Sequence, residues 1–216
     1  PHRPMAGVAA AAGGSSASVS RVAEWRHVLG QATGALSASW QRSPLVFLRH
    51  EALLAGRLRL TDVAPLIDTG RLPAGSASIS SIASGSGRPG HAGSTWTSKP
   101  LGAPLREVLP AATVYANNAG LYIPELAELC LAAVETLGWP VTCNTYLSAP
   151  GLDVSVPPHT DRQDVLILQT SGRKRWTVYA PPAVGEVDPL RRGKDGDSLA
   201  AGSLGEPLLD RTLSPG

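Results

Sequence analysis

The period of the apolar residues changes at Gly138, and this change constrains the fold more than any other feature of the sequence. Before it, Pro124 to Leu137 carries apolar residues at helical steps, with Pro124 suited to the first helical position and Gly138 to the stop. After it come short segments rich in Val, Ile, Thr, Tyr and Trp, separated by turns with Pro or Gly: Val141–Ala149, Asp164–Thr170 and Lys174–Ala180. Such segments are typical of antiparallel β-structure. The second half of the chain is therefore predicted to be mainly β, as a jelly roll or barrel.

The first half of the chain predicts helices and one short strand. Residues 21–40 form one predicted helix whose apolar residues fall mostly on one face: Val22, Trp25, Val28, Leu29 and Ala32. Pro44–Arg49 is a short apolar run that predicts a strand. A second helix is predicted to begin with Thr61 as its N-cap and to stop at Gly70.

Two segments of biased composition suggest how the chain is divided. Residues 1–20 are rich in Ala and Ser and lack acidic residues, which predicts a disordered leader or, alternatively, a transit peptide. Residues 73–95 are rich in Gly and Ser and predict a flexible insertion, in which His91 is solvated and binds no metal. The predicted division is a leader at 1–20, an N-terminal part of the main domain at 21–72, the insertion at 73–95 and a β core at 96–216.

Composition excludes several classes of partner. The 19 basic and 17 acidic residues leave a formal charge of +2, too small for a broad field that would attract nucleic acid or an acidic membrane. No run reaches the roughly 18 to 20 apolar residues that span a bilayer. The two cysteines, Cys130 and Cys143, have neither disulfide-framework nor zinc-site spacing, so we expect two buried free cysteines in a reducing compartment.

The segment Pro158-His159-Thr160-Asp161 is the strongest candidate for a metal site. In an extended segment residues i and i+2 point to the same face, so the imidazole of His159 and the carboxylate of Asp161 can converge on one point. They would supply two of the three ligands of the two-His-one-carboxylate arrangement that binds non-haem Fe(II). A His/Asp pair at this spacing also arises by chance on protein surfaces, so the surrounding sequence has to decide.

That surrounding sequence resembles a known family over some forty residues. Asn144-Thr145-Tyr146-Leu147-Ser148-Ala149-Pro150-Gly151, followed by PPHTDRQDVLILQTSGRKRWTVYAPP at 157–182, is similar to the JmjC-type ribosomal oxygenases of the cupin superfamily. These are Fe(II)- and 2-oxoglutarate-dependent histidyl and arginyl hydroxylases of proteins. The resemblance implies a double-stranded β-helix with N-terminal helices packed outside it.

The resemblance also assigns roles to particular residues. His159 and Asp161 fall on the first two iron ligands, and Lys174 falls on the lysine that pairs with the distal carboxylate of 2-oxoglutarate. Asn144 and Tyr146 fall on positions that line the same co-substrate site. Trp176 shares a face with Lys174 and is predicted to be a core aromatic.

One part of the family pattern is missing. The third ligand is expected to be a histidine several tens of residues after the lysine, but no histidine follows His159, and Leu213-Ser214-Pro215-Gly216 matches only the start of the segment before it. We therefore expect a truncated oxygenase whose β-helix is incomplete at its C-terminal edge and which lacks the family's dimerisation region.

Three functions remain open from the sequence. The first is an oxygenase that hydroxylates a protein side chain, expected on a ribosomal protein. The others are a non-catalytic cupin-fold binding module and a JmjC relative that demethylates lysine or modifies tRNA. The resemblance implies a nuclear or nucleolar location, whereas the leader leaves an organelle open.

Overall fold

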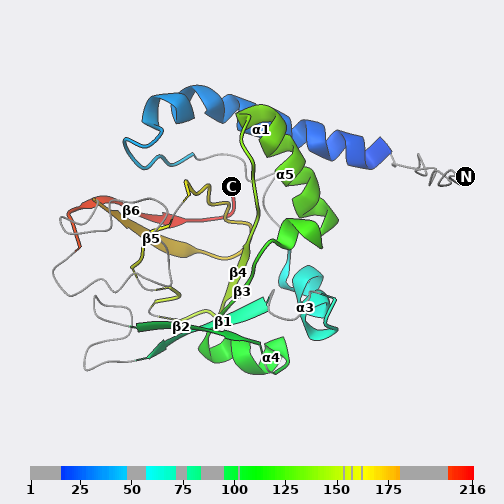
Figure 1. The fold of residues 1–216 in the computed structure, drawn as a ribbon, viewed down its shortest axis with the longest axis vertical. Helices are drawn as coiled ribbons and strands as arrows, with labels where there is room; N and C mark the ends of the chain where they lie inside the picture. Colours follow the sequence, from blue (N-terminus) through cyan, green and yellow to red (C-terminus); the bar gives the residue numbers. More distant parts are fainter. Residues whose placement is uncertain are drawn as a thin grey trace, which may run out of the picture.

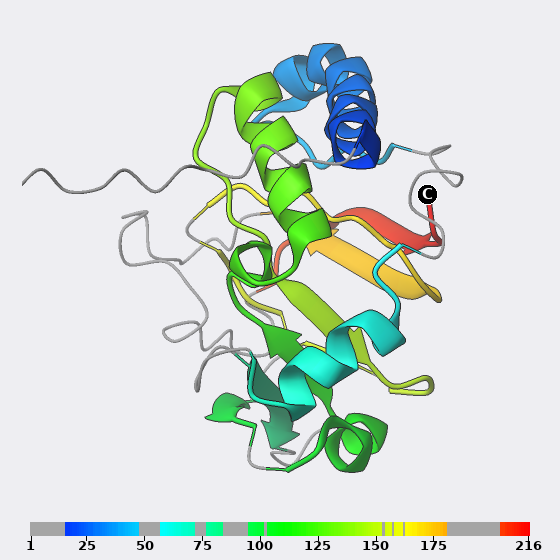
Figure 2. The same cartoon turned by 90° about the vertical axis from the view of Figure 1, so that its right-hand side faces the viewer.

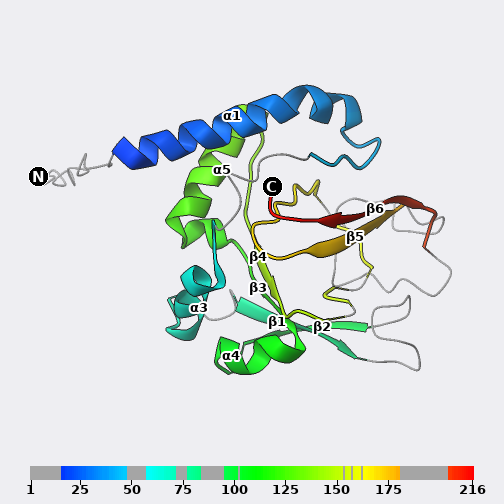
Figure 3. The ribbon, with the colours of Figure 1, turned by 180° about the vertical axis from the view of Figure 1, so that it is seen from behind.

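The computed structural model describes residues 16–47, 57–71, 77–83, 95–101, 103–152, 154–156, 158–161, 163–180 and 204–216. Figures 1 and 3 show three layers: helices α5 and α3 lie on one side of strands β3 and β4, and the β5–β6 ribbon lies on the other. The long helix α1 lies across α5 at the edge of the molecule, as the side view of Figure 2 also shows. No helix in the described ranges is long and apolar enough to cross a bilayer.

The helical layer follows the predicted apolar faces. Helix α1 spans Ser16–Ser39, and helix α5 spans Pro124–Leu137, with Pro124 in its first turn and Gly138 in the left-handed conformation at φ +75°. A proline tolerates the first turn because it has no amide hydrogen to leave unpaired, and a glycine accepts positive φ because it has no Cβ. The predicted bounds of α5 are confirmed.

Helix α3 spans Leu60–Asp68 and so begins one residue before its predicted cap, Thr61. The N-cap is Arg59, whose backbone N–H donates a hydrogen bond to the carboxylate of Asp62 at 2.7 Å. Thr61 therefore lies inside the helix, and its predicted role as N-cap is wrong. Gly70 follows the helix at φ +67°, as expected of a stop.

The helices share one hydrophobic core with strand β3. Short helical turns α4 (Leu105–Val108), η1 (Leu109–Ala111) and η2 (Ala119–Leu121) connect these elements. The core residues come from both halves of the chain: Trp25, Leu29, Val63, Ile67, Leu105, Val114, Ala116, Ala119, Ile123, Leu126, Leu129, Ala132 and Ala133. Arg21 bridges α1 to α5 through Glu125 at 3.3 Å and Glu128 at 3.1 Å.

The strands form two antiparallel sheets. The first has the order β2-β1-β3-β4 and is built from β1 (Ala77–Ala83), β2 (Thr95–Pro100), β3 (Thr113–Ala116) and β4 (Thr145–Ser148). The second pairs β5 (Lys174–Tyr179) with β6 (Pro207–Leu213). Within the described ranges the strands are few and short, and they do not close into a double-stranded β-helix.

Several predicted elements are corrected. Strand β1 lies inside the Gly/Ser-rich segment that was predicted to be a flexible insertion, because pairing with β2 and β3 supplies hydrogen bonds that its composition does not reveal. The rest of 73–94, including His91, lies outside the described residues. Residues 44–47 and 164–170 form no strand, because β propensity alone does not supply the ladder partner that a strand needs. Leu48 and Arg49 are outside the described residues.

Candidate functional site

Strands β3 and β4 present two chemically different faces. In their ladder Thr113 lies opposite Ser148, and Tyr115 lies opposite Tyr146. Because side chains alternate along a strand, these four share one face, which we call the site face. The other face carries Val114, Ala116 and Leu147 and packs against the helical core. Thr113 and Tyr115 are nonetheless buried, whereas Tyr146 is exposed, so the site face is covered over β3 and open at Tyr146.

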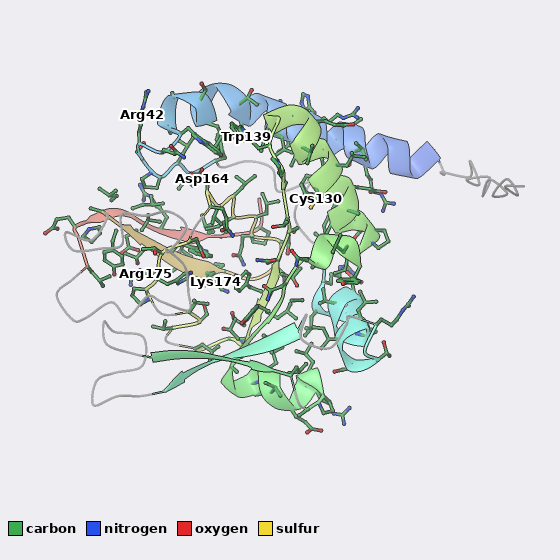
Figure 4. All side chains as sticks on the ribbon, viewed as in Figure 1. Arg42, Cys130, Trp139, Asp164, Lys174 and Arg175 are labelled. Atoms are coloured by element: carbon green, nitrogen blue, oxygen red, sulfur yellow. The ribbon has the colours of Figure 1, made fainter. Side chains whose placement is uncertain are left out.

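Lys174 reaches the site face from the opposite sheet. It is the first residue of β5, and Figure 4 shows it at the end of that strand nearest β4. Its Nζ donates a hydrogen bond to Oγ of Ser148 at 2.9 Å, and Ser148 Oγ lies 3.0 Å from Oγ1 of Thr113. These contacts join the two sheets through a lysine and two hydroxyls.

The environment of Lys174 disfavours its positive charge. The side chain is half-buried, and this burial lowers its pKa below 10.5. In the part of the chain that the structure describes, Nζ has a hydroxyl as its partner and forms no ion pair with a carboxylate. A half-buried ammonium in such surroundings is suited to receive an anion.

Two tyrosines and an asparagine continue the site face. The rings of Tyr115 and Tyr146 stack with their centroids 5.8 Å apart and an interplanar angle of 22°. Asn144, two residues before Tyr146, accepts a hydrogen bond through Oδ1 from the backbone N–H of Asn118 at 2.9 Å. Asn118 has φ +53°, a conformation that asparagine adopts more readily than most residues. This bond holds the side chain of Asn144 beside the start of β4.

His159 and Asp161 face each other. Nε2 of His159 lies 3.6 Å from Oδ2 of Asp161, and the two side chains are 19% and 29% exposed. Two cis ligands of an octahedral metal, each about 2.1 Å from it, lie about 3 Å apart, so a small rotation would bring both atoms onto one ion. No group of three or more His, Cys, Asp and Glu side chains is placed to hold a metal within the ranges described above.

Trp176 is only partly buried and lies outside the core shared by the helices, although it was predicted to be a core aromatic. By alternation it is on the same face of β5 as Lys174. Its Nε1 atom is buried and has no hydrogen-bond partner among the described residues. The indole therefore keeps an unused donor on a residue that shares a strand face with the lysine.

The sequence alone did not single out Thr113, Tyr115 or Ser148. A signal was present, because Thr113-Val114-Tyr115-Ala116 alternates polar or aromatic residues with small apolar ones. Ser148 also lies two residues after Tyr146, just as Tyr146 lies two residues after Asn144. The sequence could not predict that Thr113 and Ser148 lie opposite each other, since 34 residues separate them in the chain.

The two cysteines form a contact away from the site face. Both are free, as expected, and each thiol is the other's hydrogen-bond partner. Burial, followed by the charge and hydrogen bond of Cys130, raises the pKa of Cys143 to about 11. Both thiols are therefore neutral at physiological pH.

Comparison with known proteins identifies the domain. Residues 121–216 match the family described as JmjC domain. Among curated proteins, the bifunctional lysine-specific demethylase and histidyl-hydroxylase NO66 of Drosophila mojavensis is 36% identical over 99 residues. The same-named protein of Drosophila melanogaster is 33% identical over 99 residues. The chain is a distant homologue of these proteins.

The match covers only a part of each protein. It spans 46% of this chain but 11% of the Drosophila mojavensis protein and 14% of the Drosophila melanogaster protein. The match to the JmjC domain confirms the resemblance predicted from the sequence motifs, and a JmjC domain implies a cupin-type fold.

Proposed function

We propose that this chain carries part of the active site of a 2-oxoglutarate-dependent oxygenase, with Lys174 as the anchor for the co-substrate. The observation that supports this most directly is the environment of Lys174: a half-buried ammonium bonded to a hydroxyl, with its charge disfavoured by burial. A dicarboxylate would supply the missing negative charge. The charge-assisted bond would be stronger than a neutral one.

The proposed metal ligands are His159 and Asp161. An imidazole and a carboxylate are ligands that suit Fe(II), and their 3.6 Å separation fits adjacent coordination positions after a small rotation. When bound, Fe(II) with 2-oxoglutarate supplies the activation of dioxygen for oxidation of a C–H bond. His159 and Asp161 are two of the three protein ligands that such a site usually has. The third ligand must come from elsewhere, because the described residues place no third metal-ligating side chain beside these two.

The remaining residues would shape the co-substrate site. We assign Lys174 to the distal carboxylate of 2-oxoglutarate, and Asn144 and Tyr146 to the wall beside it. The stacked Tyr115–Tyr146 pair offers an apolar surface with polar edges, which would limit the access of water to the ligand. Exclusion of water would strengthen the ion pair of Lys174 with its carboxylate.

The proposed reaction is hydroxylation of a protein side chain, with a ribosomal protein as substrate and the nucleus as location. The relatives are named as both histidyl-hydroxylase and lysine-specific demethylase, and we favour hydroxylation because of the ribosomal-oxygenase motif around His159. A non-catalytic binding module is the second candidate. It requires only the co-substrate site around Lys174, whose contacts the structure describes.

Binding measurements on single variants test the assignment. With Mn(II) as the metal probe, we expect Lys174→Ala to weaken 2-oxoglutarate binding by about a hundredfold, as unpairing a buried charge costs about 3 to 5 kcal/mol. Its metal affinity should be unchanged. His159→Ala should lose the metal instead.

Arg173→Ala is the matched control, because Arg173 is an exposed cation next to Lys174 and should not alter binding. Equal 2-oxoglutarate affinity in the Lys174→Ala and unchanged proteins would refute the role of Lys174. Succinate formation with Fe(II) and oxygen separates the two candidates: turnover supports the oxygenase, and binding without turnover supports the module.

A further inference from the structure

The Lys174 amino group contacts a chain of two hydroxyls to which the family resemblance assigned no role. Ser148 Oγ accepts from Lys174 Nζ at 2.9 Å, and the Thr113 hydroxyl lies 3.0 Å from the same oxygen. An ammonium has no acceptor, so Ser148 must accept this bond and can donate its own proton to Thr113. The lysine therefore fixes the direction of its own bond only, and either hydroxyl can donate in the contact between Ser148 and Thr113. We call this Lys174–Ser148–Thr113 chain of hydrogen bonds the relay.

We propose that Ser148 and Thr113 are positioning residues that hold the Lys174 ammonium toward the distal carboxylate of a five-carbon dicarboxylate co-substrate. This inference rests on the proposed function, and it adds the device that makes the lysine selective. It predicts that the two hydroxyls affect ligands with a distal carboxylate and leave ligands without one unaffected.

The relay is rigid at one end and flexible at the other. Thr113 is 1% exposed and lies directly opposite Ser148 in the β3–β4 ladder, so the backbone places both hydroxyls. Lysine, by contrast, carries a charge on a flexible four-carbon stem whose ordering has an entropic cost. Because the hydrogen bond from Lys174 to Ser148 orders the lysine side chain before the ligand binds, less entropy is lost on binding. This is the general advantage of preorganisation.

The ammonium remains available to a ligand while the relay holds it. Lysine has three donors, and Ser148 accepts one of them. Two N–H groups are left for the two oxygens of a carboxylate. Burial disfavours the charge, so a carboxylate that approaches Nζ gains from a lysine that has already been oriented.

A buried hydroxyl on the same strand provides a control. Thr145 is 5% exposed, lies on the other face of β4, and its Oγ1 has no hydrogen-bond partner among the described residues. Removing the hydroxyl of Thr145 therefore perturbs the interior of the same strand without touching the relay. Ser148→Thr is the conservative variant, because it keeps the hydroxyl at Cβ.

The experiment measures binding of 2-oxoglutarate and of oxalate to the Mn(II)-loaded protein by calorimetry. Oxalate chelates the metal but has no distal carboxylate. Loss of a hydrogen bond to a charged group predicts about a tenfold rise of the 2-oxoglutarate Kd in Ser148→Ala, and about threefold in Thr113→Val, which acts through Ser148. We expect Ser148→Thr and Thr145→Val to stay within about twofold, and oxalate to bind all variants equally.

Each other result overturns the inference in an identifiable way. If Lys174→Ala weakens 2-oxoglutarate binding but Ser148→Ala does not, the relay is wrong and the proposed function stands. If Lys174→Ala also has no effect, the proposed function fails with it. If Ser148→Ala weakens oxalate and 2-oxoglutarate equally, or if Thr145→Val has the same effect as Ser148→Ala, the hydroxyls are merely structural.

Discussion

Replacing Lys174 with methionine should separate binding from stability. The substitution keeps an unbranched side chain and removes the charge. It removes one hydrogen bond to Ser148, which for a charged donor contributes about 1.5 to 3 kcal/mol. It also relieves the burial of a charge that no described carboxylate neutralises, and replacing buried charges by apolar groups is often neutral or stabilising. Ser148 keeps Thr113 as its partner. The two effects oppose each other, so the free energy of unfolding without ligand should change by no more than about 1 kcal/mol.

The ligand should reveal the difference. At a 2-oxoglutarate concentration of one hundred times its Kd, the unchanged protein gains about 2.7 kcal/mol of stability, whereas a variant that binds a hundredfold more weakly gains only about 0.4 kcal/mol. Urea denaturation with and without 2-oxoglutarate measures both quantities, with Arg173→Met as the exposed control. A ligand-free loss above about 2 kcal/mol in Lys174→Met would show that the lysine holds the two sheets together, and would refute the reasoning.

Three further predictions concern the scaffold. Leu129→Ala should cost about 2 to 5 kcal/mol in urea denaturation because Leu129 is buried, whereas Leu131→Ala, on the exposed side of α5, should stay within about 0.5 kcal/mol; equal costs would contradict the packing of α5. A Cβ at Gly205 would lie 2.7 Å from the carbonyl oxygen of Ala180, so Gly205→Ala should destabilise the β5–β6 ribbon by about 1 to 3 kcal/mol and increase its hydrogen exchange, and unchanged exchange would contradict the contact. The raised pKa of Cys143 favours folding while the thiol is neutral; this contribution is present below pH 9 and is lost as the pH rises through about 11. Relative to Cys143→Ala, stability should therefore fall over that window in pH-dependent denaturation, and parallel pH profiles would contradict the burial of the thiol.

Local sequence rules were sufficient for the bounds of α5 and the buried face of α1, but not for the start of α1, which begins at Ser16 inside the segment predicted to be a leader. Pro124 and Gly138 mark the ends of α5 because each is tied to a backbone conformation that can be read one residue at a time. The apolar face of α1 was likewise visible, and its Trp25, Leu29 and Ala32 are buried. The family motif could also be recognised from the sequence, since it is continuous from Asn144 onward.

The arrangement of the candidate site could be predicted from the sequence only for residues that are neighbours in the chain. The spacing of two predicts that His159 and Asp161 lie on one side, and they lie 3.6 Å apart. The strand predictions failed where pairing with a distant segment decides: residues 77–83 pair in a sheet despite their composition, while residues 164–170 form no strand despite theirs.

The sequence by itself therefore determined the helices, the motif and the spacing of its residues. Only the tertiary structure decided that Thr113 lies opposite Ser148 and that Lys174 reaches across from the other sheet. The physical reason is the range of the interactions involved. Helix ends and strand alternation depend on backbone preferences within a few residues, whereas strand pairing and the burial of a charge depend on which distant segments the fold brings together.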